Sequence, residues 1–141
     1  MKRTGSAVWK GGIKEGAGTV STESGVLDGV GYSFGKRFGD EKGTNPEELI
    51  GAAHASCYSM ALSGVLGAAG MTADEIATSA TVTVVPASGG GFEITAVHLD
   101  VKAKIPGADE AAFQKAAAEA KAGCPVSKVL NAEITMDASL A

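Results

Sequence analysis

Short runs of alternating apolar and polar residues, separated by glycines, fill the first third of the chain. Three of these runs predict β-strands, over residues 7–9, 19–22 and 29–34. Glycine-rich stretches such as Gly11-Gly12 lie between them and are typical of tight turns. We therefore expect a small sheet of strands joined by hairpins, with no internal repeat and no linker.

The pattern changes at residue 45, where a long helix is predicted. Asn45 can cap this helix, Pro46 suits its first turn, and Glu47 and Glu48 carry negative charge at its positive end. Apolar residues then recur at helical spacing, and the residues between them are mostly Ala, Gly and Ser. A helix that is apolar or small on every side is buried on every side. One domain of this size rarely encloses such a helix, so we expect burial against a second copy of the chain, in a homodimer.

The second half alternates strands and helices. Residues 80–85 and 92–105 predict two strands around a turn, and the apolar positions of the longer strand change phase, which indicates a β-bulge near Val97. An alanine-rich helix over residues 109–122 ends at Gly123, and Pro125 can begin another helix. Residues 134–138 close the chain as a strand. Hairpin-joined strands segregated from helices predict an α+β fold with a mainly antiparallel sheet.

Length and charge narrow the class of protein. The chain has 141 residues, enough for a single domain over residues 1–141 whose core needs no metal or disulfide. Its net charge of −4 argues against nucleic acid and against an anionic membrane surface as partners. The longest apolar stretch, residues 49–69, is interrupted by His54, serines and glycines, which predicts a buried helix rather than a membrane span. No apolar run follows Met1-Lys2-Arg3, so we expect no secretory signal and a reducing, cytoplasmic location.

Two cysteines, Cys57 and Cys124, are the sharpest chemical feature of the sequence. Each can be a small buried hydrophobe or a reactive thiol. Cys124 stands where a new helix should begin, so its sulfur would lie near unpaired N–H groups that favour a thiolate. Cys57 stands in the middle of the long helix and would need a cation from elsewhere. The local sequence thus favours Cys124 as the better thiolate.

Two other chemistries fit the sequence less well. Two Cys and two His are enough ligands by number for a tetrahedral zinc ion, but no C-x₂-C pair is present, so we expect no metal. His54 is predicted to be satisfied within the helix packing, and His98 to lie at a surface or a sheet edge. Gly31-Tyr32-Ser33-Phe34-Gly35 matches the G-x-S-x-G string of serine hydrolases, but no helical pattern follows before Asn45, so a glycine-flanked strand is predicted instead.

The residues around the two cysteines form two motifs. The first is Gly43-Thr44-Asn45-Pro46-Glu47-Glu48-Leu49-Ile50-Gly51-Ala52-Ala53-His54-Ala55-Ser56-Cys57, and the second is Ala122-Gly123-Cys124-Pro125-Val126-Ser127. In this order and spacing they resemble the cysteine motifs of the OsmC/Ohr family, the osmotically inducible protein C and organic hydroperoxide resistance proteins. The resemblance covers nearly the whole chain and is stronger to the OsmC branch. Ser56 and Tyr58 are mild departures, since the family commonly has Ala and Phe there.

The resemblance implies an intertwined homodimer, with two central helices wrapped by antiparallel sheets. It also implies a peroxidase that reduces hydroperoxides, preferably organic ones, in oxidative and osmotic stress defence. By position, Cys57 is similar to the family's peroxidatic cysteine and Cys124 to its resolving cysteine. Arg37 matches the active-site arginine, and Glu47 matches the glutamate that orients it. No cofactor is implied, and the reductant would be an external dithiol such as a lipoyl group.

Helix geometry limits how these residues can meet. Glu47 and Cys57 are ten residues apart on one predicted helix, which is about 15 Å along its axis. Glu47 therefore acts on Cys57 from a partner chain or through a mobile Arg37, which agrees with the expected homodimer. The competing hypothesis is a non-enzymatic dimeric binding or stress protein whose buried cysteines are unreactive.

Overall fold

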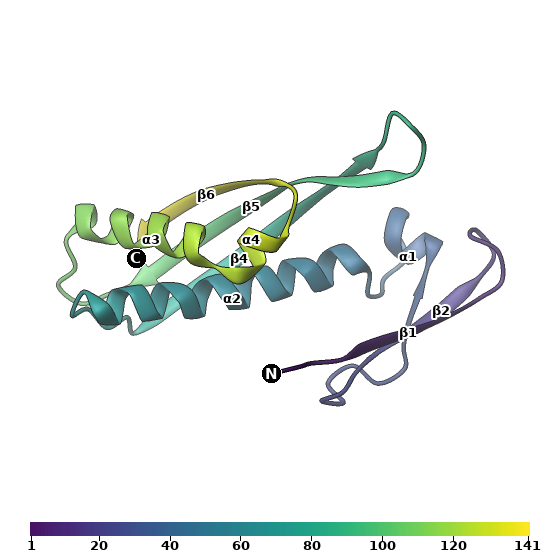
Figure 1. Cartoon of the computed structure of the whole chain (residues 1–141), viewed down its shortest axis with the longest axis horizontal. Helices are drawn as coiled ribbons and strands as arrows, with labels where there is room; N and C mark the ends of the chain where they lie inside the picture. Colours follow the sequence, from purple (N-terminus) through teal and green to yellow (C-terminus); the bar gives the residue numbers. More distant parts are fainter. The chain divides into compact units, whose positions relative to one another are not determined.

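The computed structural model describes all 141 residues, which form two compact units, residues 1–49 and 50–141. Along the chain the elements are β1 (Gly5–Lys10), β2 (Ala17–Thr22), β3 (Val30–Ser33), α1 (Phe34–Phe38), α2 (Pro46–Ala68), β4 (Glu75–Pro86), β5 (Phe92–Lys104), α3 (Glu110–Gly123), α4 (Pro125–Val129) and β6 (Glu133–Leu140) (Figure 1). The α+β class is confirmed. The single domain and the homodimer stay predictions.

The first unit is built on an antiparallel sheet in the order β1-β2-β3. Gly18, at the centre of this sheet, pairs with Trp9 on one side and Tyr32 on the other. A Cβ atom at Gly18 would meet both aromatic rings, so glycine lets them approach to 5.3 Å between centroids. The predicted hairpin strands are confirmed, and each observed strand differs from its prediction by a few residues at its ends.

Helix α1 corrects the prediction made for residues 31–35. The sequence pattern gave no helix after Ser33, but α1 begins directly after it. The Ser33 hydroxyl accepts a hydrogen bond from the Lys36 amide at 3.2 Å, which caps the helix. Ser33 also bonds to Glu41 rather than to a histidine, and its backbone is extended without a positive φ. The serine therefore serves as a helix cap and not as a hydrolase nucleophile.

Helix α2 runs through 23 residues and begins as predicted. Asn45 Oδ1 accepts the Glu48 amide at 2.9 Å, and Pro46 occupies the first helical position, where no N–H donor is needed. By length and composition α2 is apolar enough to cross a membrane, but a core helix of a soluble protein passes the same test. One face is buried within the chain through Tyr58, Leu62 and Leu66, and the opposite face is exposed.

The second unit holds the main core. Strands β4 and β5 form a long antiparallel hairpin, and β6 pairs with β5 in parallel (Figure 1). The register shifts between Thr83 and Val84, which leaves Thr95 without a partner. This bulge lies two residues before Val97, so the predicted change of phase is confirmed, and Val97, Leu99 and Val101 then point into the core. The predicted strand over residues 80–85 was too short, since β4 begins at Glu75.

Candidate active site

The two cysteines meet in the second unit, although 67 residues separate them in the chain. Cys57 comes from the middle of α2, and Cys124 lies between α3 and α4. Their Sγ atoms are 2.9 Å apart. A covalent S–S bond is about 2.05 Å long, and both residues are free cysteines. The two sulfurs are therefore a dithiol in reach of disulfide formation, which the sequence alone could not show.

Cys124 joins two helices and is fully buried. Its amide donates to the Ala120 carbonyl at 2.9 Å, and its own carbonyl accepts from Lys128 at 3.1 Å, so α3 ends and α4 begins at this residue. Burial acts to raise the pKa of the Cys124 thiol. Hydrogen bonds from Cys57, from the Ser127 amide and hydroxyl, and from the Val126 amide outweigh burial, and the net pKa is lowered. This agrees with the prediction that the start of a helix favours a thiolate at Cys124.

Cys57 is partly exposed and has the opposite shift. Burial raises the pKa of its thiol, and the hydrogen bond with Cys124 raises it further, against a lowering contribution from the Val126 amide. The negative charge of Cys124 raises it as well, and no cation is among the groups that act on it. When the two cysteines share one negative charge, that charge therefore resides on Cys124. Cys57 needs an added cation to become the thiolate, as the sequence indicated.

His54 lies one turn before Cys57 on α2 and has no exposed surface. Its Nε2 atom is 2.7 Å from the Ser127 hydroxyl on α4. Its Nδ1 atom is buried and has no hydrogen-bond partner. Burial lowers the pKa of His54, so the imidazole is neutral at neutral pH. The prediction that His54 is satisfied within the packing is therefore wrong for one of its two nitrogens. The sequence offered no signal for its contact with Ser127.

Arg37 and Glu47 form an ion pair within the first unit. Arg37 lies in α1, and Glu47 lies in the first turn of α2. The guanidinium donates from Nη2 to one carboxylate oxygen at 2.7 Å and from Nε to both oxygens at 3.2 Å. Glu47 is 8% exposed, and the Arg37 side chain is 37% exposed. The buried carboxylate thus fixes one edge of a guanidinium whose remaining donors can face a ligand.

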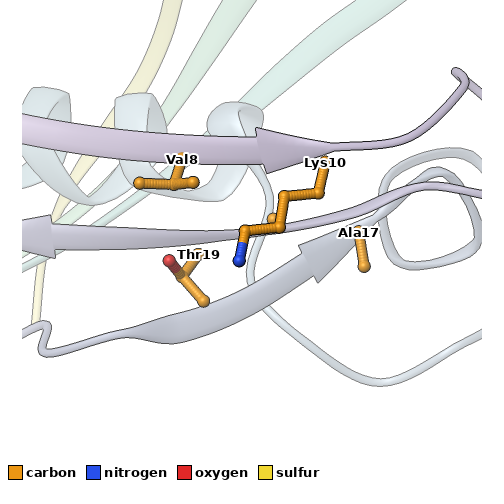
Figure 2. Close-up of a pocket in the computed structure, with 5 residues that line it drawn as sticks. Val8, Lys10, Ala17 and Thr19 are labelled. Carbon is orange, nitrogen blue, oxygen red and sulfur yellow. The ribbon is translucent and has the colours of Figure 1, made fainter.

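An aromatic hollow lies beside Arg37 in the same unit. It has a volume of about 230 Å³, and Trp9, Tyr32, Phe34 and Phe38 are among the residues that line it. The guanidinium carbon is 4.9 Å from the Phe38 ring centroid. An apolar group can therefore be bound here next to a cation. A second hollow, on the face of β1 and β2, is lined by Val8, Lys10, Ala17, Gly18 and Thr19 and holds neither a thiol nor a carboxylate (Figure 2).

The second histidine lies on the exposed side of the β5–β6 pair. His98 Nδ1 is 2.7 Å from the Thr135 hydroxyl, and its Nε2 is 3.7 Å from Asp100 and 3.5 Å from Asp137. These three groups are close enough together to ligate an ion, but both carboxylates are exposed. His98 is partly exposed, as predicted, and it takes no part in the dithiol.

Comparison with known proteins connects this geometry to a family. Residues 39–139 match the OsmC-like protein family. The chain is 55% identical over 140 residues to peroxiredoxin OsmC of Escherichia coli strain K12, and this match covers 99% of the chain and 97% of the relative.

Solved structures agree with the sequence match. The crystal structure of the organic hydroperoxide resistance protein OhrB of Bacillus subtilis superposes with a TM-score of 0.74 at 26% identity, covering 96% of this chain and 98% of that one. An organic hydroperoxide resistance protein of Elizabethkingia anophelis gives a TM-score of 0.76 at 28% identity, covering 100% and 99%.

Proposed function

The chain belongs to the OsmC-like protein family and is a cysteine-based peroxidase, and we propose that it reduces organic hydroperoxides with Cys57 and Cys124 as its redox pair. The observation that carries this proposal is the 2.9 Å separation of the two sulfurs. A thiol oxidised at one of them has a second thiol in position to attack it. Isolated buried cysteines, as a non-enzymatic protein would have, need no such pairing.

The reaction has three steps. The Cys57 thiolate attacks the terminal oxygen of R–O–O–H, the O–O bond breaks, and the alkoxide leaves with a proton as the alcohol, while Cys57 becomes a sulfenic acid. The Cys124 thiolate then attacks the Cys57 sulfur, the S–O bond breaks, and hydroxide leaves with a proton as water. An external dithiol returns two electrons and two protons by thiol–disulfide exchange.

Exposure supports Cys57 as the residue that meets the peroxide. Cys57 is partly exposed, whereas Cys124 has no exposed surface. Its raised pKa is the difficulty, and a guanidinium beside it would remove this difficulty by stabilising the thiolate. Arg37, held by Glu47, is the cation that we assign to this role.

The length of α2 supports a homodimer as the working form. Glu47 and Cys57 stand ten residues apart on this one helix, or about 15 Å along its axis, so the carboxylate does not reach the thiol of its own chain. We propose that the Arg37–Glu47 pair of one protomer acts at Cys57 of its partner. The small and apolar exposed face of α2 supplies a surface for this association.

The hollow beside Arg37 supports an organic substrate. Its aromatic lining would hold the alkyl group of a hydroperoxide while the guanidinium binds the peroxide oxygens. Hydrogen peroxide lacks this alkyl group and should react more slowly. The reductant that we propose is a dithiol, with lipoyl groups as one candidate, and the cytoplasm is the compartment that would supply it.

A thiol count tests the proposal. The reduced protein is treated with one equivalent of cumene hydroperoxide, alongside Cys57→Ser and Cys124→Ser. We expect both thiols to be lost in the parent, no reaction in Cys57→Ser, and a sulfenic or overoxidised Cys57 in Cys124→Ser. Survival of both thiols in the parent would mean that the cysteines are structural. A reaction retained in Cys57→Ser would instead exchange the roles of the two cysteines.

A further inference from the structure

His54 is a buried titratable residue that the proposed peroxide chemistry does not use. It has no exposed surface, one nitrogen bonded to Ser127 at 2.7 Å, and one nitrogen without a partner. A buried polar atom without a partner destabilises a fold, because it has given up its hydrogen bonds to water. An apolar residue at position 54 would avoid that loss, so the histidine has to be explained by what its paired nitrogen does.

The proton of the neutral imidazole can be placed from these contacts. A buried N–H donor without an acceptor is rarer in proteins than an acceptor without a donor. We therefore assign the proton to Nε2, which leaves the unpartnered Nδ1 as an acceptor. Nε2 then donates to the Ser127 oxygen, and the single hydroxyl proton of Ser127 is free to point elsewhere.

The position of Ser127 in α4 directs that proton to Cys124. Cys124 is the residue that caps α4, and Ser127 is the third residue of the helix. A side chain at this third position lies in the same turn as the capping residue and can reach back toward it. In that position the Ser127 hydroxyl contributes to lowering the pKa of the Cys124 thiol. The 2.7 Å contact between His54 and Ser127 therefore links His54 to the environment of the Cys124 sulfur.

We propose that His54 is a positioning residue, which orients the Ser127 hydroxyl as a hydrogen-bond donor to the Cys124 thiolate during disulfide formation and reduction. The inference rests on the proposed function for its place in the reaction cycle. In disulfide formation the thiolate attacks the Cys57 sulfenic acid and displaces hydroxide, which is released as water. In reduction the external thiolate attacks the more exposed Cys57 sulfur, and Cys124 leaves as the thiolate, which leaves faster when it is stabilised.

The first test needs no peroxide. In a Cys57→Ser background only Cys124 can react with iodoacetamide, and its alkylation rate against pH gives the pKa of its thiol. Adding Ser127→Ala or His54→Leu should raise this pKa and lower the thiolate fraction at neutral pH about tenfold, because a hydrogen bond to a charged sulfur is lost. His54→Gln, which can keep an N–H donor near the position of Nε2, should restore most of the rate.

Ser59→Ala is the matched control. Ser59 lies on the same helix as His54, and its hydroxyl is bonded to Thr78 at 2.8 Å, away from the sulfurs. We expect this variant to leave the alkylation profile where it was. An equal loss in Ser59→Ala, or an unchanged profile in both Ser127→Ala and His54→Leu, would overturn the inference.

A second measurement separates this inference from the proposed function. With Cys57 intact, Ser127→Ala should accumulate more Cys57 sulfenic acid that dimedone can trap, because Cys124 attacks it more slowly. If no variant or parent consumes peroxide but the alkylation profile shifts as expected, the proposed function fails and the positioning role of His54 stands. If peroxide is consumed and trapping is equal in parent and variant, the inference fails alone.

Discussion

At the scale of single residues, the ion pair of Arg37 and Glu47 is the contact to which we assign the activation of the peroxide. The carboxylate binds the guanidinium through Nε and Nη2, so its orientation is fixed by three hydrogen bonds rather than by charge alone. Glu47 is nearly buried while Arg37 is partly exposed. The buried acid thus holds a cation whose other edge can reach outward.

Glu47→Gln should slow oxidation of Cys57 by about 10- to 100-fold. A glutamine has only one acceptor oxygen, so it cannot accept all the hydrogen bonds from the guanidinium, which then loses its orientation. The measurement is the rate of Cys57 sulfenic acid formation with cumene hydroperoxide in a Cys124→Ser background. Glu23→Gln is the matched control, since Glu23 pairs with Arg3 on an exposed surface. A rate in Glu47→Gln equal to that of the control would remove Glu47 from the site.

The sequence predicted local features around the two cysteines better than it predicted contacts between distant residues. A helix start at Pro125 is a local signal, and it correctly indicated that Cys124 would be the better thiolate. The 2.9 Å contact between Cys57 and Cys124 and the 2.7 Å contact between His54 and Ser127 join positions 67 and 73 residues apart. No local pattern encodes such distances. The family resemblance indicated that the two cysteines act together, but no feature of the sequence indicated the contact between His54 and Ser127.

At the scale of elements, helix α2 reaches β4 closely because of one glycine. A Cβ atom at Gly51 would lie 2.9 Å from the Ala80 carbonyl oxygen. This oxygen belongs to the strand backbone, so it cannot move away by a change of rotamer. The glycine costs the helix up to about 1 kcal/mol relative to alanine. The close approach of helix and strand accounts for its presence.

Gly51→Ala should therefore destabilise the protein, since overpacking costs about 1–3 kcal/mol and exceeds the gain in helix propensity. Gly123→Ala, the same change at the last residue of α3, meets no atom within 4 Å and should be neutral or slightly stabilising. The free energy of unfolding by urea, at one fixed protein concentration, measures both. Equal effects in the two variants would show that the contact with Ala80 does not matter.

Short elements and the ends of elements were predicted less well from the sequence pattern than long elements. The bulge in β5 was predictable, because a change of apolar phase is visible within one strand. Helix α1 was missed because five residues are too few to display a 3.6-residue period, and its cap at Ser33 resembled a different motif. The start of β4 was also missed, since alternation of Ile76 and Thr78 with small residues is weak.

At the scale of the whole molecule, α2 raises the question of what covers its exposed face. This helix lies beside part of β4, where Ser59 bonds to Thr78, and Tyr58, Leu62 and Leu66 face the core. Its other face consists of small residues and Met60, whose side chain is 77% exposed. A small and apolar helix face of this kind is suited to close packing against an identical helix.

Met60→Glu should convert the homodimer to a monomer, because it places a charge where we expect two copies of α2 to pack. Sedimentation velocity gives the mass, and Val26→Glu, at a residue that is 84% exposed in a loop, should leave the dimer intact. The monomer should lose peroxide reduction, since Arg37 and Glu47 of a second copy are absent, yet diamide should still oxidise its adjacent cysteines to a disulfide. A monomeric parent, or a monomeric Met60→Glu with full peroxidase activity, would mean that one chain assembles the site alone.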